Sequence, residues 1–561
     1  MSKIIQRPCP NDTAMQLERD GLSPLLARIY AARGITTRTQ LDTDIQHLLP
    51  FKLLKNAQAM ASLLADAIAQ QQKLLIVADY DADGATACSV GLRGLRALGA
   101  QVDFIVPNRF EYGYGLTPEI VRLAAQSKPN IILTVDNGIA SVEGVAEAHR
   151  LGIQVLVTDH HLPGDTLPDA ECIVNPNQLG CEFPSKNLAG VGVMFYVLMA
   201  LRAELRARGT FATRPEPNLG SLLDLVALGT VADVVKLDDN NRILVHQGLQ
   251  RIRAGRGSAG IQALLRLMRR PAAQTTSYEL GFIVGPRLNA AGRLEDMSLG
   301  IRCLISDDTT ESDAIAAQLD ALNHERRSIE ADMQDSALAA LNLFNPADSY
   351  SLSLFNEDWH QGVIGILASR LKDKFHRPVI AFAHAQTGEI KGSGRSIPGL
   401  HLRDALDLVS KRHPHLILKF GGHAMAAGLS IREMDLAQFR QAFEQVCSEL
   451  LDADALIKSI ATDGALQPAE FSLELARELQ QQVWGQGFAE PLFEGDFDVE
   501  SQRVVGEKHL KLKLKSVAGS VDAIYFFYNE PVADTVHAVF SLSINEYNGK
   551  QTLQLIVRHC M

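Results

Sequence analysis

The sequence has few cysteines, and none of them forms a metal-binding or disulfide pattern. Its seven cysteines include no Cys-x-x-Cys pair and no spacing typical of structural zinc. The N-terminal segment has no apolar stretch of signal-peptide length, and nowhere do about 18 apolar residues follow one another. These absences argue against a disulfide-stapled or membrane-spanning protein and predict a cytoplasmic one with free thiols.

Positive net charge is also missing, although nucleic-acid-binding proteins usually gather lysine and arginine to neutralise phosphates. The formal net charge is -11 at pH 7. The segment 251–270 is a local exception, because it carries six arginines and no acid: Arg251, Arg253, Arg256, Arg266, Arg269 and Arg270. A solvated surface explains this run as well as a phosphate contact does, so charge alone does not decide the partner.

The apolar residues that are present predict an α/β fold. With 561 residues, 46% of them hydrophobic, the chain can bury several cores, since one domain takes about 100–200 residues. Short apolar runs alternate with amphipathic stretches, which is typical of a parallel sheet with helical crossovers. The runs that predict strands are 74–77, 102–106, 131–135 and 155–158, with helices over 117–125 and 141–151.

Later segments change character and predict further domains. The pattern from Asp308 to Leu343 is typical of one long helix, and strict alternation in 510–515 predicts a strand of a small β-barrel. The predicted division is an N-terminal arm (1–50), a parallel-sheet domain (51–305), a connecting helix (306–345), a mixed α/β domain (346–451) and the barrel domain (452–561).

Acidic residues follow three of the predicted strands. Asp79 follows the first, Asp136 the third, and Asp159-His160-His161 the fourth. Ligands of an open parallel sheet bind outside the carboxyl ends of its strands, so these segments converge on one crevice. A single such Asp is more often a helix N-cap or a turn residue, but the repetition favours a shared site.

The segment 79–84, Asp-Tyr-Asp-Ala-Asp-Gly, also resembles the start of a calcium loop. Such a loop needs a bidentate Glu at its twelfth position, where this sequence has Val90. Clustered carboxylates repel one another unless cations lie among them. With histidine in the set, manganese is favoured and magnesium stays open. Two such ions can activate water and stabilise charge on phosphorus, which predicts phosphoester hydrolysis.

The stretch 222–235 offers two more acids, Asp224 and Asp233, on a mostly apolar helix. An acid in such surroundings needs a partner, and a metal ion is one candidate. Residue types alone do not show whether Asp224 or Asp233 is the metal ligand.

Together these motifs resemble, in order, those of the DHH phosphoesterase superfamily. The matching segments are 79–84, Val-Asp-Asn-Gly at 135–138, Asp-His-His at 159–161 and Val-Ala-Asp at 231–233. The segment 421–428, Gly-Gly-His-Ala-Met-Ala-Ala-Gly, resembles the signature of the associated DHHA1 domain. The C-terminal segment resembles an oligonucleotide-binding (OB) barrel, in which the lysines of 511–515 lie on one face. Five motifs in order make the likeness specific over nearly the whole chain.

The resemblance implies a 5′→3′ exonuclease that releases mononucleotides from single-stranded DNA in repair and recombination. It implies two ions, Mn²⁺ or Mg²⁺, and prefers Asp233 to Asp224. The implied metal ligands are Asp79, Asp81, Asp83, Asp136, His160 and Asp233, and the implied catalytic residues are His161, Asp136 and Asp81. The implied substrate-binding residues are Arg109, Tyr112, Tyr114, Arg287, Ser393, Arg395 and His423.

The sequence departs from the superfamily pattern at two positions. Other members have a His where this chain has Val77, so the resemblance leaves open whether Asp79 takes its place. Lys236 stands where Pro is expected, beyond the last carboxylate.

Two other functions compete with the exonuclease. A phosphodiesterase for oligonucleotides or cyclic dinucleotides would use the same two-metal core but needs no third domain. A nucleic-acid-binding protein with a decayed site is opposed by the intact acids and histidines. The family also implies single-strand-binding protein and a recombination helicase as partners of a monomer that does not associate with membranes.

Overall fold

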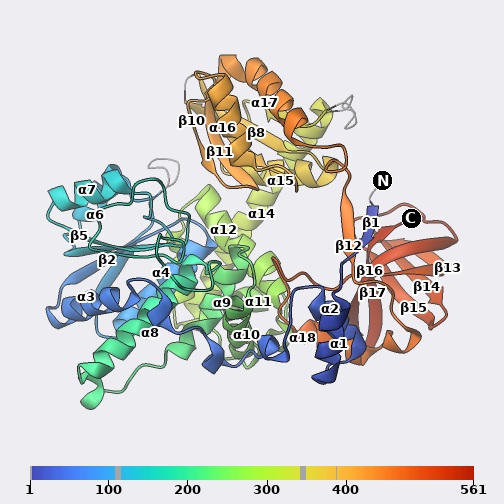
Figure 1. Cartoon of the computed structure of the whole chain (residues 1–561), viewed down its shortest axis with the longest axis horizontal. Helices are drawn as coiled ribbons and strands as arrows, with labels where there is room; N and C mark the ends of the chain where they lie inside the picture. The colour runs from blue at the N-terminus through green and yellow to red at the C-terminus, as the bar shows by residue number, and fades with distance from the viewer. Residues whose placement is uncertain (1–2, 108–114, 342–348, 387) are drawn as a thin grey trace. The chain divides into compact units, whose positions relative to one another are not determined.

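The computed structural model describes residues 3–107, 115–341, 349–386 and 388–561 (Figure 1). By Cα proximity the chain forms two compact units. One consists of Gln6–Asp320 with Ala461–Met561, and the other of Met1–Ile5 with Ala321–Ile460. This division is coarser than the predicted domain boundaries, which stay predictions.

The larger unit contains a five-stranded parallel sheet in the order β3-β2-β4-β5-β6. Its strands are β2 (Lys73–Ala78), β3 (Gln101–Ile105), β4 (Ile131–Val135), β5 (Gln154–Thr158) and β6 (Cys172–Val174). The chain adds β3 on one side of β2 and then crosses to add β4 on the other. This reversal creates a topological switch point at the carboxyl ends of β2 and β4, where α/β proteins bind ligands.

Helices cover both faces of this sheet, which is why its central strands are apolar throughout. On one face α6 (Pro118–Ala125) and α7 (Val142–Arg150) pack on Leu75 and Val77 (Figure 1). Ile76 points the opposite way, toward α4. The helices associated with that second face are α3 (Ala57–Ala69), α4 (Ala82–Ala97) and α8 (Gly190–Ala207).

Helices follow the sheet in the same unit. They are α9 (Leu223–Ala232), α10 (Asp239–Arg253), α11 (Ala259–Leu267), the π-helical segment η7 (Glu279–Val284), α12 (Gly285–Leu294) and α13 (Ser298–Ile305). The long helix α14 spans Thr309–Ala340, which confirms the predicted connecting helix. It buries the apolar side chains Ile315, Leu319 and Met333.

The smaller unit is a mixed α/β domain, as predicted. Its sheet has the order β10-β11-β9-β8-β7, in which β7 and β8 are parallel and the other pairs antiparallel. The strands are β7 (Leu352–Phe355), β8 (Val379–Gln386), β9 (Glu389–Arg395), β10 (Lys419–Gly422) and β11 (Ala426–Arg432). The helices are α15 (Ile364–Phe375), α16 (Leu402–Arg412) and α17 (Leu436–Leu450).

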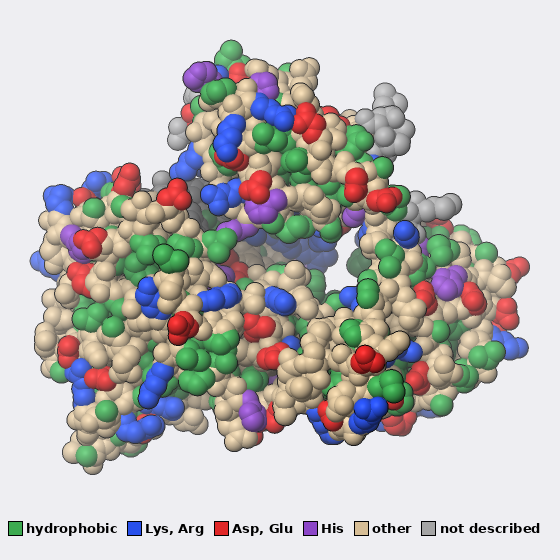
Figure 2. All heavy atoms as spheres, viewed as in Figure 1, with side chains coloured by type: hydrophobic (Ala, Val, Ile, Leu, Met, Phe, Trp, Pro, Cys, Tyr) green, Lys and Arg blue, Asp and Glu red, His purple; other side chains and the backbone are tan. Residues whose placement is uncertain are grey.

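The C-terminal segment forms a closed barrel in the order β13-β14-β15-β17-β16. Its strands are β13 (Phe493–Val505), β14 (His509–Ser516), β15 (Gly519–Tyr525), β16 (Thr535–Tyr547) and β17 (Lys550–Cys560), preceded by α18 (Leu473–Gln481). Along β14 the leucines are buried and the lysines face outward, which confirms the alternation predicted for 510–515. Acidic and basic side chains are interspersed on this barrel (Figure 2).

Residues 6–50 of the N-terminal arm belong to the same unit as the barrel. The helices of the arm are α1 (Asn11–Arg19) and α2 (Pro24–Ala31). Tyr30 stacks on Trp484 with ring centroids 6.0 Å apart, and Arg33 forms a buried ion pair with Asp463 at 2.7 Å. Strands β1 (Lys3–Gln6) and β12 (Ser459–Thr462) form a small separate sheet. No helix among the described residues is long and apolar enough to cross a membrane.

Candidate metal centre

The acids that follow the strands lie at one level of the sheet edge. Ala78 pairs with Val135, and Val135 pairs with Thr158. Each of these residues directly precedes a carboxylate, so Asp79, Asp136 and Asp159 emerge side by side. Parallel pairing in this register therefore creates the cluster that the sequence predicts.

His160 lies at the centre of the cluster. Its Nε2 is 3.1 Å from Asp136 Oδ1, 3.5 Å from Asp233 Oδ2 and 3.9 Å from Asp83 Oδ2. Three overlapping groups of potential metal-ligand atoms each lie within 4.8 Å of one another: Asp136-His160-His161, Asp83-His160-Asp233 and Asp79-Asp81-Asp136. All six predicted metal ligands belong to these groups.

Two helices carry the remaining acids into the cluster. Asp81 is the N-cap of α4, and its Oδ1 accepts the N–H groups of Asp83 and Gly84 at 2.9 and 3.0 Å. Asp83 lies in the first turn of the same helix. Asp233 is the C-cap of α9, whereas Asp224 near the start of that helix bonds to the Ser258 amide. The structure thus brings Asp233, and not Asp224, to the cluster.

Backbone amides of α8 hold Asp83. Its two carboxylate oxygens accept from Gly190 N at 2.5 Å and from Val191 N at 2.9 Å. The start of a helix favours negative charge, so α8 fixes this carboxylate by geometry and by its dipole. The apolar sequence around Gly190 shows no polar side chain that would have predicted this contact.

Gly190 also leaves room for Asp136. A Cβ on Gly190 would lie 2.6 Å from Asp136 Cβ, closer than carbon atoms pack. Asp136 itself has a left-handed backbone, with φ 62°. The next side chain stabilises this turn, because Asn137 Nδ2 donates to Val77 O at 3.1 Å and to Val135 O at 2.9 Å.

Three carboxylates of the cluster have raised pKa values. Burial, followed by the charge of Asp81, raises the pKa of Asp83 to about 7. Burial and the neighbouring acids likewise raise the pKa values of Asp136 and Asp233 well above the usual range. A cation among these oxygens removes the repulsion. Several carboxylates with one or two imidazoles form a donor set that suits Mn²⁺ or Mg²⁺, so the residues fit the predicted metal pair.

His161 is oriented by a buried acid. Its Nδ1 lies 2.7 Å from Asp159 Oδ1, and Asp159 also accepts from Ile139 N at 2.9 Å. Burial alone would lower the pKa of His161, but the bond to Asp159 and the charges of Asp79 and Asp81 raise it to about 9. The sequence predicts Asp159 at the site but does not predict that Asp159 orients His161. A carboxylate two residues before a histidine was the available signal.

The predicted substrate-binding residues are distributed over the chain. Arg109, Tyr112 and Tyr114 lie outside the described residues. Arg287 is 5% exposed, and its guanidinium donates to Asp320 at 2.9 Å and to Ile283 O at 2.7 Å. These contacts indicate that Arg287 supports α12.

Ser393, Arg395 and His423 belong to the smaller unit. Arg395 Nη1 donates to Ser393 Oγ at 3.2 Å and to Gly394 O at 2.8 Å. Gly365, in the first turn of α15, lies against both side chains, because a Cβ there would be 2.9 Å from Ser393 Oγ and 3.0 Å from Arg395 Nη2. His423 lies in the turn between β10 and β11 and is exposed.

Two exposed aromatic rings were not predicted. Tyr278 and Phe282 are 55% and 71% exposed and stack with centroids 5.1 Å apart. Tyr278 is the N-cap of η7 and Phe282 lies within it. Gly285 directly follows η7, and a Cβ on it would lie 3.2 Å from the Cβ of Ala232. Ala232 directly precedes Asp233. The spacing of four residues between the two rings, just before Gly-Pro-Arg, was the available sequence signal.

Comparisons with known proteins define the class. Family models for the DHH family N-terminal domain, the DHHA1 domain and the RecJ OB domain match residues 73–230, 348–449 and 462–559. The parallel-sheet domain is thus that of the DHH family, followed by a DHHA1 domain and an OB domain.

Individual relatives narrow this class. The chain is 50% identical to the single-stranded-DNA-specific exonuclease RecJ of Dickeya dadantii over 96% of both chains. It is 49% identical to RecJ of Escherichia coli, over 96% of this chain and 95% of the relative. The crystal structure of RecJ from Thermus thermophilus with Mn²⁺ covers all of this chain and 79% of its own, with a TM-score of 0.84 and 30% identity. The chain belongs to the RecJ family of single-stranded-DNA-specific exonucleases.

Proposed function

We propose that this chain binds two divalent cations, Mn²⁺ or Mg²⁺, in its acid-histidine cluster and hydrolyses single-stranded DNA from the 5′ end to mononucleotides. The convergence of three other segments on His160 carries this proposal. The solved relatives contain Mn²⁺ or Mg²⁺, and the donor set of this chain suits either ion.

The predicted ligands divide between two groups, and the third group, Asp136-His160-His161, overlaps one through Asp136 and the other through His160. Asp79, Asp81 and Asp136 form one group of oxygens, and Asp83, His160 and Asp233 form another. Asp79 is 7% exposed and shares one group of potential ligand atoms with Asp81 and Asp136, which supports its role as a ligand in place of the histidine missing at Val77. When bound, a pair of divalent ions supplies the Lewis acidity for attack on a phosphodiester.

His161 is proposed to contact the scissile phosphate. Because Nδ1 is engaged by Asp159, Nε2 is the nitrogen that can donate to a phosphate oxygen. Asp159 keeps the imidazole protonated near neutral pH, since it raises the pKa of His161 despite burial. A charged imidazole stabilises the negative charge that accumulates on the phosphoryl oxygens.

The polarity of the reaction is proposed to depend on Ser393 and Arg395, with Arg109 as a further phosphate ligand. The Arg395 guanidinium bonds only to neutral oxygens in the described contacts. It lies near the start of α15, whose amides favour an anion. A terminal 5′ phosphate carries more charge than an internal one, so this group prefers a strand end. We also propose further residues that contact the substrate or support such contacts: Tyr112, Tyr114, Arg287 and His423.

The first test replaces one oxygen and one nitrogen ligand separately. We expect Asp81→Ala and His160→Ala to reduce manganese-dependent degradation of 5′-labelled single-stranded DNA on the order of 10³-fold or more, with little loss of DNA binding. Asp66→Ala and His149→Ala remove the same groups from exposed positions and should leave the rate unchanged. Full activity in either cluster variant would refute the metal assignment.

Substrate choice tests the remaining alternative. The wild-type chain is incubated with Mn²⁺ and DNA labelled at either end, RNA or a cyclic dinucleotide. Early release of the 5′ label from DNA as a mononucleotide supports the exonuclease. Hydrolysis of the cyclic dinucleotide alone would instead indicate a small-molecule phosphodiesterase.

The family resemblance extends the proposal to the cell. We propose that the chain acts as a cytoplasmic monomer in DNA repair and recombination, with single-strand-binding protein and a recombination helicase as partners. Co-purification of either protein, together with light scattering of the isolated chain, tests these assignments.

A further inference from the structure

A second charged site lies at the far ends of the helices that carry the metal ligands. Asp83 is in the first turn of α4, and Arg93 lies ten residues further along it. Asp233 caps the end of α9, and Asp224 lies near its start. At about 1.5 Å per residue, each helix separates its two charged residues by roughly 14–15 Å. A cavity of about 390 Å³ occupies this far end.

Four arginines line this cavity, which we call the arginine cavity. Its charged and capping residues are Arg93, Asp224, Arg251, Arg256, Ser258 and Arg266. The only other charged residue of the lining is Asp307, so positive charges outnumber negative ones by four to two. The site therefore differs in sign from the metal centre at the opposite ends of α4 and α9.

Exposed acids do not cancel this charge. Arg93 contacts Asp307 at 2.7 Å, but the Asp307 side chain is 84% exposed. Arg266 contacts Asp313 at 2.6 Å, and both side chains are about half exposed. Solvent-exposed ion pairs are weak and are screened by salt. An anion with more than one charge can compete for both arginines.

The other two arginines have no acidic partner at ion-pair distance among the described residues. Arg251 Nη2 donates to Arg256 O at 2.9 Å, and Arg251 Nε is shielded from solvent with no hydrogen-bond partner in the described chain. The buried acid nearby, Asp224, accepts from Ser258 N at 2.6 Å. A shielded guanidinium N–H without an acceptor is costly, so this arrangement favours a bound anion.

Helix α11 adds a favourable dipole. It begins at Ala259, and its N-cap Ser258 forms no side-chain capping bond, so the amides of the first turn are available to an anion. The lining contains no aromatic side chain on which a base could stack. The cavity therefore suits phosphate groups rather than nucleobases.

We propose that the arginine cavity is a second phosphate-binding site, separate from the metal centre. Its ligand is the phosphate of a free nucleotide or of pyrophosphate, or adjacent phosphates of a DNA strand. This site gives a function to part of the arginine run at 251–270, because Arg251, Arg256 and Arg266 line the cavity. Arg269 and Arg270, from the same run, do not line it and are exposed.

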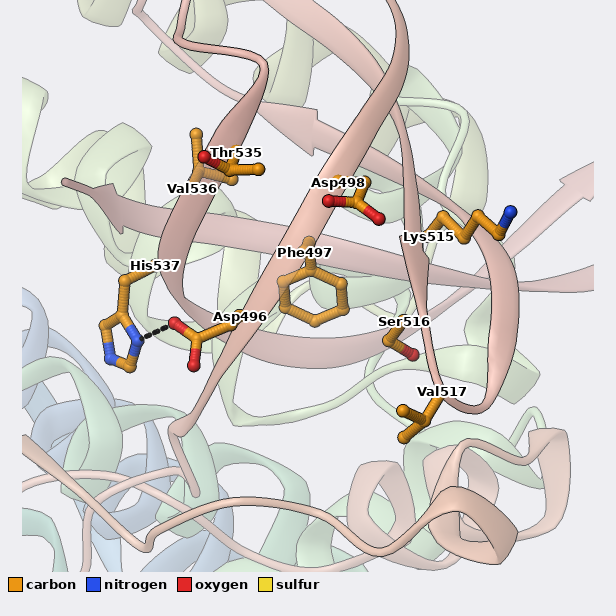
Figure 3. A pocket seen from close by; sticks show the side chains of 9 residues that line it. All are labelled: Asp496, Phe497, Asp498, Lys515, Ser516, Val517, Thr535, Val536 and His537. Carbon is orange, nitrogen blue, oxygen red and sulfur yellow. Dashed lines mark hydrogen bonds and ion pairs between the residues drawn. The ribbon is translucent and has the colours of Figure 1, made fainter.

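A second cavity, on the barrel, has a lining without the excess of positive charge found in the arginine cavity. It measures about 510 Å³, and its charged residues are Asp496, Asp498, Lys515 and His537 (Figure 3). His537 Nδ1 lies 2.7 Å from Asp496 Oδ1, so the histidine is already paired with an acid. Without an excess of positive charge, this larger cavity does not attract phosphate.

The test measures pyrophosphate binding to the full chain by calorimetry, with EDTA present so that the metal centre does not contribute. We expect Arg251→Gln/Arg256→Gln to weaken binding by about tenfold or more, because it removes two charged donors. Arg269→Gln/Arg270→Gln removes the same charge from exposed positions and should leave binding within about twofold. Binding at Ser393 and Arg395 is common to both variants and cancels in their comparison.

Two further arms identify the source of the phosphate. Weaker binding of deoxythymidine monophosphate by the cavity variant alone indicates a nucleotide site, and weaker binding of a long oligothymidylate indicates a strand contact. Equal affinities of the two double variants for all three ligands would overturn the proposal. Should the double variant unfold, Arg256→Gln alone gives the same comparison, because the Arg256 side chain makes no described hydrogen bond or ion pair and is exposed.

Discussion

The metal centre and the lysine strand of the barrel use charge in opposite ways. In the centre, Asp83 and Asp136 are 1% and 2% exposed, and each predicted ligand offers one atom within 4.8 Å of atoms from two other acids or histidines. On β14, Lys513 and Lys515 are exposed. Lys513 lies 3.8 Å from Glu500, and Asp522 faces it across the strand pair.

This difference predicts how substitutions act. Buried charges are held by fixed partners in a low-dielectric setting, so loss of one partner changes the reactivity of the whole group. Exposed charges are solvated and screened, so each contributes little and nearly independently. Variants of the centre should therefore change turnover strongly, whereas variants of β14 should change DNA affinity weakly and in a salt-dependent way.

After the ligand variants themselves, the largest effect is expected from Asp159→Asn, which changes no atom of a proposed metal ligand. The amide keeps the size of the carboxylate but loses the charge that holds His161 Nδ1 at 2.7 Å. Loss of such a supporting partner costs about 10- to 100-fold in activity, and we expect kcat to fall by about the upper value. Asp165→Asn, the same change in an exposed loop, is the control and should leave kcat unchanged.

The pH profile separates this role from a structural one. Burial lowers the pKa of His161, but the hydrogen bond and charge of Asp159, with the charges of Asp79 and Asp81, raise it to about 9 in the metal-free chain. Without the carboxylate, the pKa falls and the imidazole loses its proton at lower pH. The alkaline limb of the kcat profile should move to lower pH in Asp159→Asn. A uniform decrease in kcat with an unshifted limb would contradict the role of His161 as a charged group.

The sequence predicts those features of the centre that depend on local patterns. Apolar runs followed by acids predict strand ends, and parallel pairing of neighbouring strands brings these ends together. Contacts made by the backbone of distant segments have no such signature. Gly190 and Val191 hold Asp83 through amides that every residue except proline possesses. The bond between Arg287 and Asp320 joins residues 33 positions apart, which no local pattern connects.

An intermediate effect is expected from the exposed aromatic pair near the centre. Stacking on an aromatic ring stabilises bound single strands by ~1–3 kcal/mol per base, and Tyr278 and Phe282 offer two rings. We expect Tyr278→Ala/Phe282→Ala to weaken single-stranded DNA binding by about tenfold, measured by fluorescence anisotropy without divalent metal. Tyr278→Phe/Phe282→Tyr keeps both rings and should bind as the wild type does. Equal weakening in both pairs would exclude stacking.

The smallest effect is expected from the lysines of β14. Each phosphate contact contributes about 0.7 to the slope of log affinity against log salt for a single strand. Lys511→Gln and Lys515→Gln should each lower this slope by about that amount and weaken binding only a few-fold. Lys513→Gln should change it less, because Glu500 already lies 3.8 Å from its ammonium group. Glu500→Gln should strengthen binding slightly, since it frees Lys513 for phosphate. A loss of turnover in any of these variants at saturating DNA would contradict the separation between buried chemistry and exposed binding, because β14 contributes no residue to the acid-histidine cluster.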